Sequence, residues 1–397
     1  MTAPVRPLPP LDDLPPEVVE IAASLEKAGF ETWCVGGALR DRLLDHPTVK
    51  VDLATAATPD QVLNLFPRTV AVGIKYGTVG VLDRHRVLHE VTTFRRDVAT
   101  DGRHAVVEYG VSLEEDLARR DFTINALAYH PLRREWRDPF GGAADLGRRV
   151  LRAVGDPGGR FAEDYLRILR AFRFAARFGF AIDPPTWQAA VERVEGLRGL
   201  SAERVREEWF KGLETAASLA RLVGLWHESG AGSIWIPELA IPFPLPEESP
   251  VPRDPIVLTA ALCVRPGEVL TRLRASNTEI GRARAMGTGP AEPGSSAPAA
   301  VRRWMAMTGP ARADLRLLAR YRKGTDPGWA QVVDEIEARG EPTARNQLAV
   351  TGDDLRQAGI PPGPQLGQVL TRLLEAVLED PSLNTRDRLL EMARAWS

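Results

Sequence analysis

Cysteine is scarce in this 397-residue chain, which has only Cys34 and Cys263, far apart in the sequence. Two distant cysteines argue against a disulfide framework or a cysteine-ligated zinc site, and they favour a reducing compartment. No run of about 18 apolar residues occurs, so we expect no membrane span. Residues 1–16 are rich in proline and lack a basic stretch followed by an apolar one, unlike a signal peptide. We therefore expect a cytoplasmic protein.

Net charge is also small, at −2, which does not by itself indicate a nucleic-acid-binding protein. A chain with this charge can still bind nucleic acid if its basic residues gather on one face. Histidine is rare in the second half, where only His227 follows His130, so no histidine–aspartate phosphohydrolase signature occurs there. The length is enough for two to four modules, and 44% hydrophobic residues can fill real cores.

The first part of the chain mixes helix and strand patterns. We expect helices at 17–30, 38–44 and 59–65, and strands at 31–35, 51–54, 69–72, 78–82 and 87–94. From about residue 160 the patterns become helical, and the proline-rich stretch 241–255 is expected to be a connector. Residues 350–396 are again helical, with one break at Pro361-Pro362. The expected domains are an N-terminal extension (1–16), a mixed α/β head (17–150) and helical regions at 151–240 and 241–397.

A glycine pair between the first expected strand and the next helix is the first candidate site. Gly36 and Gly37 allow the backbone to approach an anion, and the helix N-terminus that follows favours negative charge. Arg40, on the first turn, could add a charge-assisted contact to phosphate. Taken alone, a glycine pair is more often a structural turn.

Two acidic residues fall on expected strands. Asp52 lies on the expected strand that follows the glycine turn and the next helix. A carboxylate there could hold Mg²⁺ for phosphoryl or nucleotidyl transfer. Taken alone, such an aspartate is more often a surface residue. Glu90 lies inside a strand of β-branched residues, where burial is costly without a partner. An active-site carboxylate and a cross-strand ion pair are equally consistent with Glu90.

Polar residues meet again where we expect an apolar helix to begin, at Arg119, Arg120, Asp121 and Asn125. Adjacent arginines can clamp a triphosphate, whereas capping and surface pairing is the alternative interpretation.

The segment 163–177 gives the strongest signal. At about 100° per residue, one helix would place Glu163 and several arginines on one broad face. The arginines of this face are Arg167, Arg170, Arg173 and Arg177. Arginine suits phosphates and base edges, and Asp164 beside Arg167 offers an acceptor next to donors. This pair could bind the Watson–Crick edge of a base, as a template base does.

Together these stretches, in this order and spacing over roughly residues 17–215, resemble the tRNA nucleotidyltransferase and poly(A) polymerase family, specifically the class II CCA-adding type. Supporting stretches are 73–79, 101–103, 138–142, 200–204 and 352–355. The resemblance implies an α+β fold: a polymerase-β-like nucleotidyltransferase head with a mixed sheet, followed by an all-α neck, body and tail.

The resemblance also implies an enzyme that adds C, A or both to the tRNA 3′ end from CTP and ATP, with Mg²⁺ held by Asp52 and Glu90 as catalytic carboxylates. It implies that Gly37 and Arg40 contact the triphosphate and that Arg120, with Arg119, holds the nucleotide. Asp164 and Arg167 would select the base, with Arg170 and Arg173 lining the same pocket. The implied nucleotide-binding set is Gly36, Gly37, Arg40, Arg119, Arg120, Asp121, Asn125, Asp164, Arg167, Arg170 and Arg173. The tRNA elbow would lie along the helical body and tail, and the sequence indicates no oligomeric state.

The chain departs from the family pattern at Lys50. That pattern places two aspartates, one residue apart, where this chain has Lys50 and Asp52. An ammonium cannot ligate Mg²⁺, and losing one of three carboxylates that bridge two metals usually cripples in-line transfer. Three interpretations of Lys50 follow: an altered nucleotidyltransferase in which Lys50 itself offsets phosphate charge, a family member that binds tRNA or nucleotide without transfer, and a lysine introduced to trap a complex. A separate alternative for the substrate is a poly(A) polymerase or a partial enzyme that adds only CC or only A.

Overall fold

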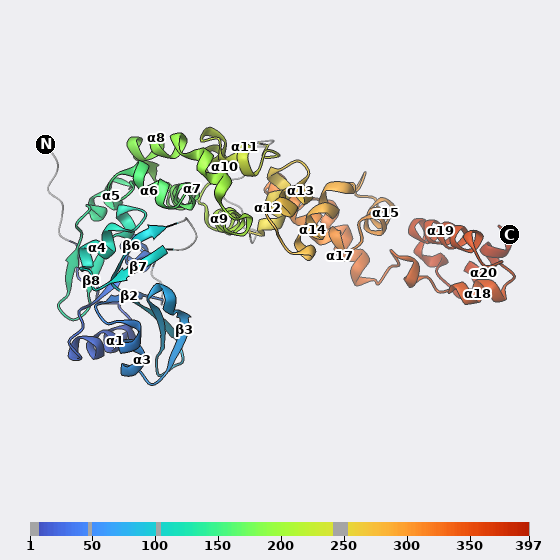
Figure 1. The fold of residues 1–397 in the computed structure, drawn as a ribbon. Coiled ribbons are helices and arrows are strands. Elements are labelled where there is room, and N and C mark those ends of the chain that lie inside the picture. The colour runs from blue at the N-terminus through green and yellow to red at the C-terminus, as the bar shows by residue number, and fades with distance from the viewer. Residues whose placement is uncertain (1–7, 47–49, 101–104, 241–252, 397) are drawn as a thin grey trace. The chain divides into compact units, whose positions relative to one another are not determined.

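The computed structural model describes residues 8–46, 50–100, 105–240 and 253–396, and the chain folds into two compact units (Figure 1). The first unit is Met1–Trp235 and the second is Ile236–Ser397. The predicted head and most of the predicted helical region 151–240 lie in the first unit. The finer domain boundaries stay predictions, because the contacts divide the chain only once. The proline-rich stretch 241–252 lies outside the described residues.

A seven-stranded mixed sheet forms the centre of the head, in the order β3-β4-β5-β2-β1-β8-β9. Its strands are β1 (Thr32–Val35), β2 (Asp52–Thr55), β3 (Thr69–Gly73), β4 (Thr78–Leu82), β5 (Leu88–Thr93), β8 (Ala128–His130) and β9 (Glu135–Arg137). β2 runs parallel to β5, whereas the other neighbouring strands are antiparallel. The strands predicted between residues 31 and 94 are confirmed to within about two residues at each end.

Short helices follow the strands of the head (Figure 1). They are α1 (Pro16–Lys27), α2 (Gly37–Leu43), α3 (Pro59–Leu65), α4 (Leu113–Ala118) and α5 (Gly142–Arg148). Capping boxes at Thr58 and Ser112 fix the starts of α3 and α4, because each side chain accepts a backbone N–H of the first turn. Trp33, Phe94 and Leu117 pack in a buried core that joins the sheet to α4.

The prediction of an apolar helix after Arg120 is wrong. Residues Thr123–Asn125 form a single 3₁₀ turn, and the next residues enter β8, which pairs with β1. The turn is held from outside: a Cβ on Gly142 would lie 2.2 Å from the Thr123 carbonyl oxygen, so only glycine allows this approach. The sequence pattern also missed the two-stranded sheet of β6 (Arg95–Thr100) and β7 (Ala105–Tyr109).

Helices make up the rest of the first unit, together with the short parallel pair β10 (Val150–Leu151) and β11 (Ala181–Ile182). The helices are α6 (Pro157–Glu163), α7 (Leu166–Phe178), α8 (Pro184–Glu192), α9 (Ala202–Thr215), α10 (Leu219–Glu228) and α11 (Ala231–Trp235). α7 packs against α9 and α10 through its apolar face, on which Ile168, Leu169 and Phe172 are fully buried.

The single helix expected over 163–177 is in fact two. The backbone is extended at Asp164, with φ −156° and ψ 105°, and the Asp164 carboxylate accepts the Leu166 N–H at 3.0 Å. A carboxylate that binds a nearby backbone N–H competes with helix continuation, so the chain turns here and α7 starts anew.

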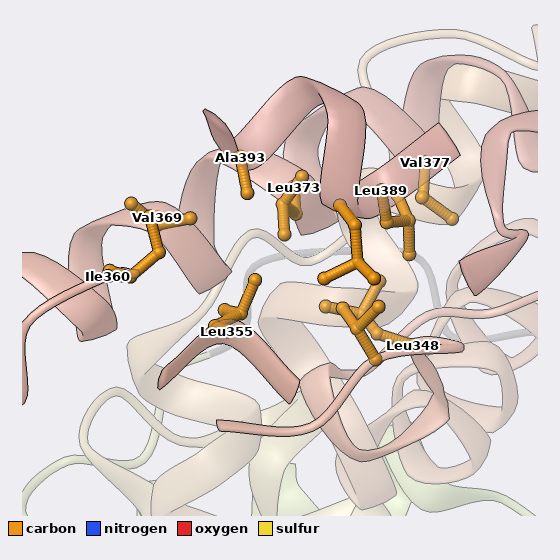
Figure 2. Close-up of a cluster of buried hydrophobic side chains, with 10 residues drawn as sticks. Leu348, Leu355, Ile360, Val369, Leu373, Val377, Leu389 and Ala393 are labelled. Atoms are coloured by element: carbon orange, nitrogen blue, oxygen red, sulfur yellow. The ribbon is translucent and has the colours of Figure 1, made fainter. Parts of the chain in front are cut away.

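The second unit is helical throughout its described residues. Its helices are α12 (Pro255–Leu262), α13 (Pro266–Arg272), α14 (Asn277–Thr288), α15 (Pro298–Thr308), α16 (Arg312–Lys323), α17 (Trp329–Ala338), α18 (Gly352–Gln357), α19 (Pro364–Glu379) and α20 (Arg386–Ala395). Figure 2 shows the C-terminal core, where Leu355, Leu373 and Leu389 point toward one another from α18, α19 and α20. The helical pattern predicted for 350–396 is broken twice, not once, because a second turn follows α19. None of the described helices is long and apolar enough to cross a membrane.

Candidate active site

A cavity of about 520 Å³ lies in the first unit, where the sheet meets α2 and α7. All of the predicted nucleotide-binding residues line it, together with Asp52. Its wall holds Arg40, Arg119, Arg120, Arg167, Arg170, Arg173, Arg177 and Arg204, against the acidic Asp52, Asp121 and Asp164. The side chains that face the cavity therefore include more cations than anions, which suits a polyanion such as a nucleoside triphosphate.

The glycine turn brings the two sides of this cavity together. β1 ends at Val35, and Gly36 follows with φ +83°, a conformation that favours glycine. A Cβ on Gly36 would lie 3.4 Å from Nη1 of Arg120 and 3.8 Å from Oδ2 of Asp52. The turn thus places bare backbone between an arginine and a carboxylate that come from distant parts of the chain.

Arg40 forms the floor of the cavity and is buried. Its Nε and Nη2 donate to Asp41 Oδ1 at 2.8 and 2.7 Å, and its Nη1 donates to Asn125 Oδ1 at 2.5 Å. The guanidinium also lies 4.9 Å from the ring centre of Phe174 and 4.7 Å from that of Phe178. Burial lowers the pKa of Arg40, although the adjacent Asp41 opposes the change. Arginine stays charged in proteins, so this group is a fixed cation under the site.

The arginine pair at 119–120 is held by one buried carboxylate. Asp116 Oδ1 accepts Nε and Nη2 of Arg119 at 3.0 and 2.8 Å, and Asp116 Oδ2 accepts Nη2 of Arg120 at 3.1 Å. Burial alone would raise the pKa of Asp116, but the two arginines overcome this effect and lower it. Asp116 therefore orients both guanidinium groups from one point.

Asp121 connects the head to α7. Its Oδ2 accepts Nε of Arg170 at 2.8 Å, while its Oδ1 accepts the Asn125 amide and the Phe122 N–H, both at 2.8 Å. Burial would raise the pKa of Asp121, yet the Arg170 charge and these hydrogen bonds lower it to about 2. These hydrogen bonds connect the 121–125 segment of the head to the arginine face of α7.

Asp164, in the turn before α7, and Arg167, in the first turn of α7, both line the cavity. Besides the Leu166 N–H, Asp164 accepts Nη2 of Arg204 at 2.7 Å. Nη1 of Arg167 donates to Glu163 Oε2 at 2.6 Å. Both side chains that the resemblance assigns to base selection are therefore held in place by neighbours before any base arrives.

The sequence-based site lacked three residues of this wall, Leu166, Phe174 and Arg204. Arg177, which the sequence places on the arginine face, also lines the cavity. Phe174 supports the arginines, with Arg173 4.2 Å and Arg170 5.3 Å from its ring centre. The periodicity of α7 could have found Phe174, because it follows Arg170 by four residues and so lies on the same side of the helix.

Sequence reasoning also missed Glu208, an acidic residue that contacts the arginines of the wall from α9. Glu208, buried on α9, accepts Nε of Arg173 at 2.6 Å, and its Oε1 lies 3.8 Å from Nη1 of Arg170. No local pattern around Glu208 indicates this contact, because its partners lie 35 and 38 residues away.

Asp52 and Glu90 lie side by side at the other edge of the site. β2 and β5 are parallel neighbours with Leu53 opposite Val91, which puts Asp52 beside Glu90. Burial, and next the Glu90 charge, raise the pKa of Asp52 above its ordinary value, while the Lys50 and Arg120 charges oppose this. Asp52 lines the cavity, and Glu90 is not among the described residues that do.

Lys50 forms an ion pair with one of these carboxylates, Glu90. Its Nζ lies 2.5 Å from Oε1 of Glu90, and the two side chains are 55% and 31% exposed. The hydrogen bond to Glu90 raises the pKa of Lys50. Glu90 therefore forms an ion pair, as one of its two interpretations predicted, and its partner is Lys50.

These residues do not fit a pair of divalent metal ions. Across the described part of the chain, no group of three or more acidic, histidine or cysteine side chains could hold a metal ion. Asp52 and Glu90 supply two carboxylates, and an ammonium is paired with one of them. A bridged metal pair needs more negative charge than this set carries.

Three family models match the chain. One, described as "Poly A polymerase head domain", matches residues 32–152, and another, described as "Probable RNA and SrmB- binding site of polymerase A", matches 179–241. A tRNA nucleotidyltransferase domain 2 model matches 331–393. A CCA-adding enzyme of Limosilactobacillus fermentum is 34% identical over 402 residues, which cover 94% of this chain and 95% of that one. The chain belongs to the family of CCA-adding enzymes. These are tRNA nucleotidyltransferases, as the sequence predicts.

Other members of the CCA-adding family agree. An Anoxybacillus flavithermus CCA-adding enzyme is 40% identical over 226 residues, which span 56% of each chain. The crystal structure of the Bacillus stearothermophilus CCA-adding enzyme in complex with CTP has a TM-score of 0.79, with 31% identity, and covers 97% of this chain and 98% of that one. The predicted α+β fold, with a nucleotidyltransferase head followed by helices, is confirmed.

Proposed function

We propose that this protein transfers nucleotides from CTP and ATP to the 3′ end of tRNA, adding C, A or both. The observation that carries the proposal is the cavity itself, which gathers every predicted nucleotide-binding residue from segments up to about 140 residues apart. The related Bacillus stearothermophilus enzyme was solved with CTP, and this supports the same nucleotide here.

The arginines around the glycine turn form the proposed triphosphate site. Gly37 opens α2, and Arg119 and Arg120 reach the cavity on the rigid Asp116 support. Arg40 keeps donors beyond its three hydrogen bonds, so it can contact a phosphate from below. When the tRNA 3′-hydroxyl attacks the α-phosphorus, pyrophosphate leaves, and fixed cations stabilise the charge that builds on it.

Asp164 and Arg167 form the proposed base site. Cytosine and adenine each present an amino donor beside a ring-nitrogen acceptor on the Watson–Crick edge, whereas uracil and guanine present the reverse order. An aspartate acceptor next to an arginine donor matches the first pattern and opposes the second. The contacts with Arg204 and Glu163 fix the spacing of the two groups.

The conditions of the reaction are proposed as well. The family normally uses a divalent cation, and we propose Mg²⁺, brought to the site on the phosphates of the nucleotide. Cys34 and Cys263 are both buried and form no disulfide, which agrees with a reducing, cytoplasmic compartment.

A second candidate function rests on the Lys50–Glu90 pair. If the ammonium blocks transfer, the protein is a family member that binds tRNA or nucleotide without extending it. Such a protein would retain salt-sensitive tRNA binding, because that depends on the arginines and not on the carboxylates.

The test is extension of tRNA transcripts that end before CCA, after C and after CC, with Mg²⁺ and radiolabelled CTP or ATP. Lys50→Asp runs beside the native chain, and a poly(A) primer tests for poly(A) addition. Extension by the native chain supports transfer, and the transcript used separates CCA, CC-only and A-only addition. Extension by Lys50→Asp alone identifies the binding-only protein. Failure of both proteins, together with no tRNA binding, overturns the proposal.

A further inference from the structure

The ammonium of Lys50 occupies a defined place among the carboxylates of the site. Lys50 lies two residues before Asp52, close enough for the charges of the two side chains to interact. The neighbouring strand brings Glu90 beside Asp52, and Nζ of Lys50 lies 2.5 Å from Glu90 Oε1. The positive charge therefore lies beside both carboxylates and is paired with one of them, Glu90.

The charges of this edge limit what it can bind. Asp52 and Glu90 carry two negative charges and Lys50 one positive charge, which leaves a net charge of about −1 when all three are ionised. Two divalent ions would add four positive charges beside the ammonium of Lys50. One divalent ion carried by a triphosphate needs far less negative charge from the protein, because the phosphates neutralise most of the charge of the ion.

We infer that Lys50 is a built-in cation that takes the place of one metal ion of the family pattern, so that the head binds a nucleoside triphosphate with at most one divalent ion. The inference rests on the proposed function for the identity of the nucleotide. It also explains how the arginine wall can remain complete while one carboxylate of the pattern is a lysine. Lys50 neutralises Glu90 from within the chain, and the nucleotide meets the cationic wall as before.

The experiment measures equilibrium binding without tRNA, so that no transfer occurs. CTP affinity is determined by calorimetry for the full chain in Mn²⁺ and in excess EDTA. The number of Mn²⁺ ions bound per protein–CTP complex is determined by electron paramagnetic resonance. The proteins are the native chain, Lys50→Asp, which restores the pattern, and Lys50→Met, which removes the charge at similar volume. Lys211→Asp is the matched control, because Lys211 is an exposed lysine on α9 paired with Glu207.

The native chain and Lys211→Asp are expected to bind one Mn²⁺ with CTP, and to lose less than about tenfold in CTP affinity in EDTA. Lys50→Asp is expected to bind two Mn²⁺ ions and to lose at least about a hundredfold in EDTA. Lys50→Met is expected to bind one Mn²⁺ and to bind CTP in EDTA about tenfold more weakly than the native chain does.

Two Mn²⁺ ions in the native complex would overturn the inference, and so would equal EDTA sensitivity of the native chain and Lys50→Met. A native chain that binds no CTP also overturns it. If Lys50→Asp does not fold, Lys50→Met and the native stoichiometry still decide the matter. The transfer assay decides the proposed function separately: a protein with one bound metal ion and no transfer supports this inference and refutes transfer.

Discussion

The arginine wall and the carboxylate edge of the same site are built in different ways. Several arginines in the wall are paired with buried acids: Arg119 and Arg120 with Asp116, Arg170 with Asp121, and Arg173 with Glu208. Arg40 is itself buried and is paired with the partly buried Asp41. At the edge, the Lys50–Glu90 pair is partly exposed. Buried pairs are costly to break, whereas exposed pairs contribute little to stability. The wall is therefore part of the fold, and the edge can change without affecting it.

The largest expected effect comes from breaking the wall at Asp121. We expect Asp121→Asn to lower the free energy of unfolding of the first unit by about 3 kcal/mol at pH 7, because asparagine keeps one acceptor oxygen but has no charge, which leaves Arg170 without this ion-pair partner. Urea unfolding measures the change. Asp60→Asn, an exposed aspartate in the first turn of α3, is the control, with a loss of under about 1 kcal/mol.

The pH dependence of this loss sharpens the prediction. The pKa of Asp121 is lowered from 3.8 to about 2 in the folded protein, so its contribution is present above pH 4 and disappears as pH falls toward 2. The difference between the native chain and Asp121→Asn should therefore shrink by about 2 kcal/mol over that range. A difference that stays constant with pH would show that the pKa of Asp121 is the same in the folded and unfolded states, which would contradict the pairing with Arg170.

Arg120 tests the wall as a binding surface. Removing a charge-assisted donor to phosphate typically costs about 2 kcal/mol, so Arg120→Ala should weaken CTP binding by about thirtyfold. Calorimetric titration with CTP measures it. Arg133→Ala removes an equal charge from an exposed pair elsewhere in the head and should leave affinity within about twofold. Equal losses in the two variants would mean that only overall charge matters.

A change at Arg204 tests whether its hydrogen bond to Asp164 positions the acceptor of the base site. Without its contact to Asp164 Oδ2, the carboxylate keeps only the Leu166 N–H, so the acceptor is less well fixed. We expect Arg204→Met to reduce the preference for CTP over UTP by about tenfold, with Arg204→Lys restoring part of it. The measured quantity is the ratio of the two affinities, which a general loss of folding would leave unchanged. An unaltered ratio would contradict the positioning role.

Local patterns in the sequence predicted most of the fold and the site. The first strands follow from β-branched residues between turns, and the turn at Gly36 follows from its glycines. The breaks at Asp164 and Thr123 were missed for different reasons. At Asp164 a side chain binds the backbone N–H two residues further on, which helical periodicity does not take into account. At Thr123 the cause is Gly142, which approaches from 19 residues away. Periodicity assumes that a helix continues, and it cannot see such contacts.

The partners of the site residues were harder to predict than the residues themselves. Asp121 meets Arg170 across 49 residues, and Glu208 meets Arg173 across 35. One sequence holds no signal for such pairs, because many acids and arginines are available and only the fold selects among them. Family resemblance supplied the cavity residues, but it did not show that Lys50 would bind Glu90.

The smallest expected effect is that of Lys50→Met on stability. Lys50 is more than half exposed, and exposed ion pairs contribute between about 0 and 1 kcal/mol, so the variant should unfold within about 1 kcal/mol of the native chain. Thermal and urea unfolding measure this under the conditions used for Asp121→Asn. A loss above about 2 kcal/mol would mean that the pair belongs to the fold. The expected small change, beside a clear change in nucleotide binding in EDTA, would instead show that this lysine acts on the charge of the site, which is the difference between the edge and the wall.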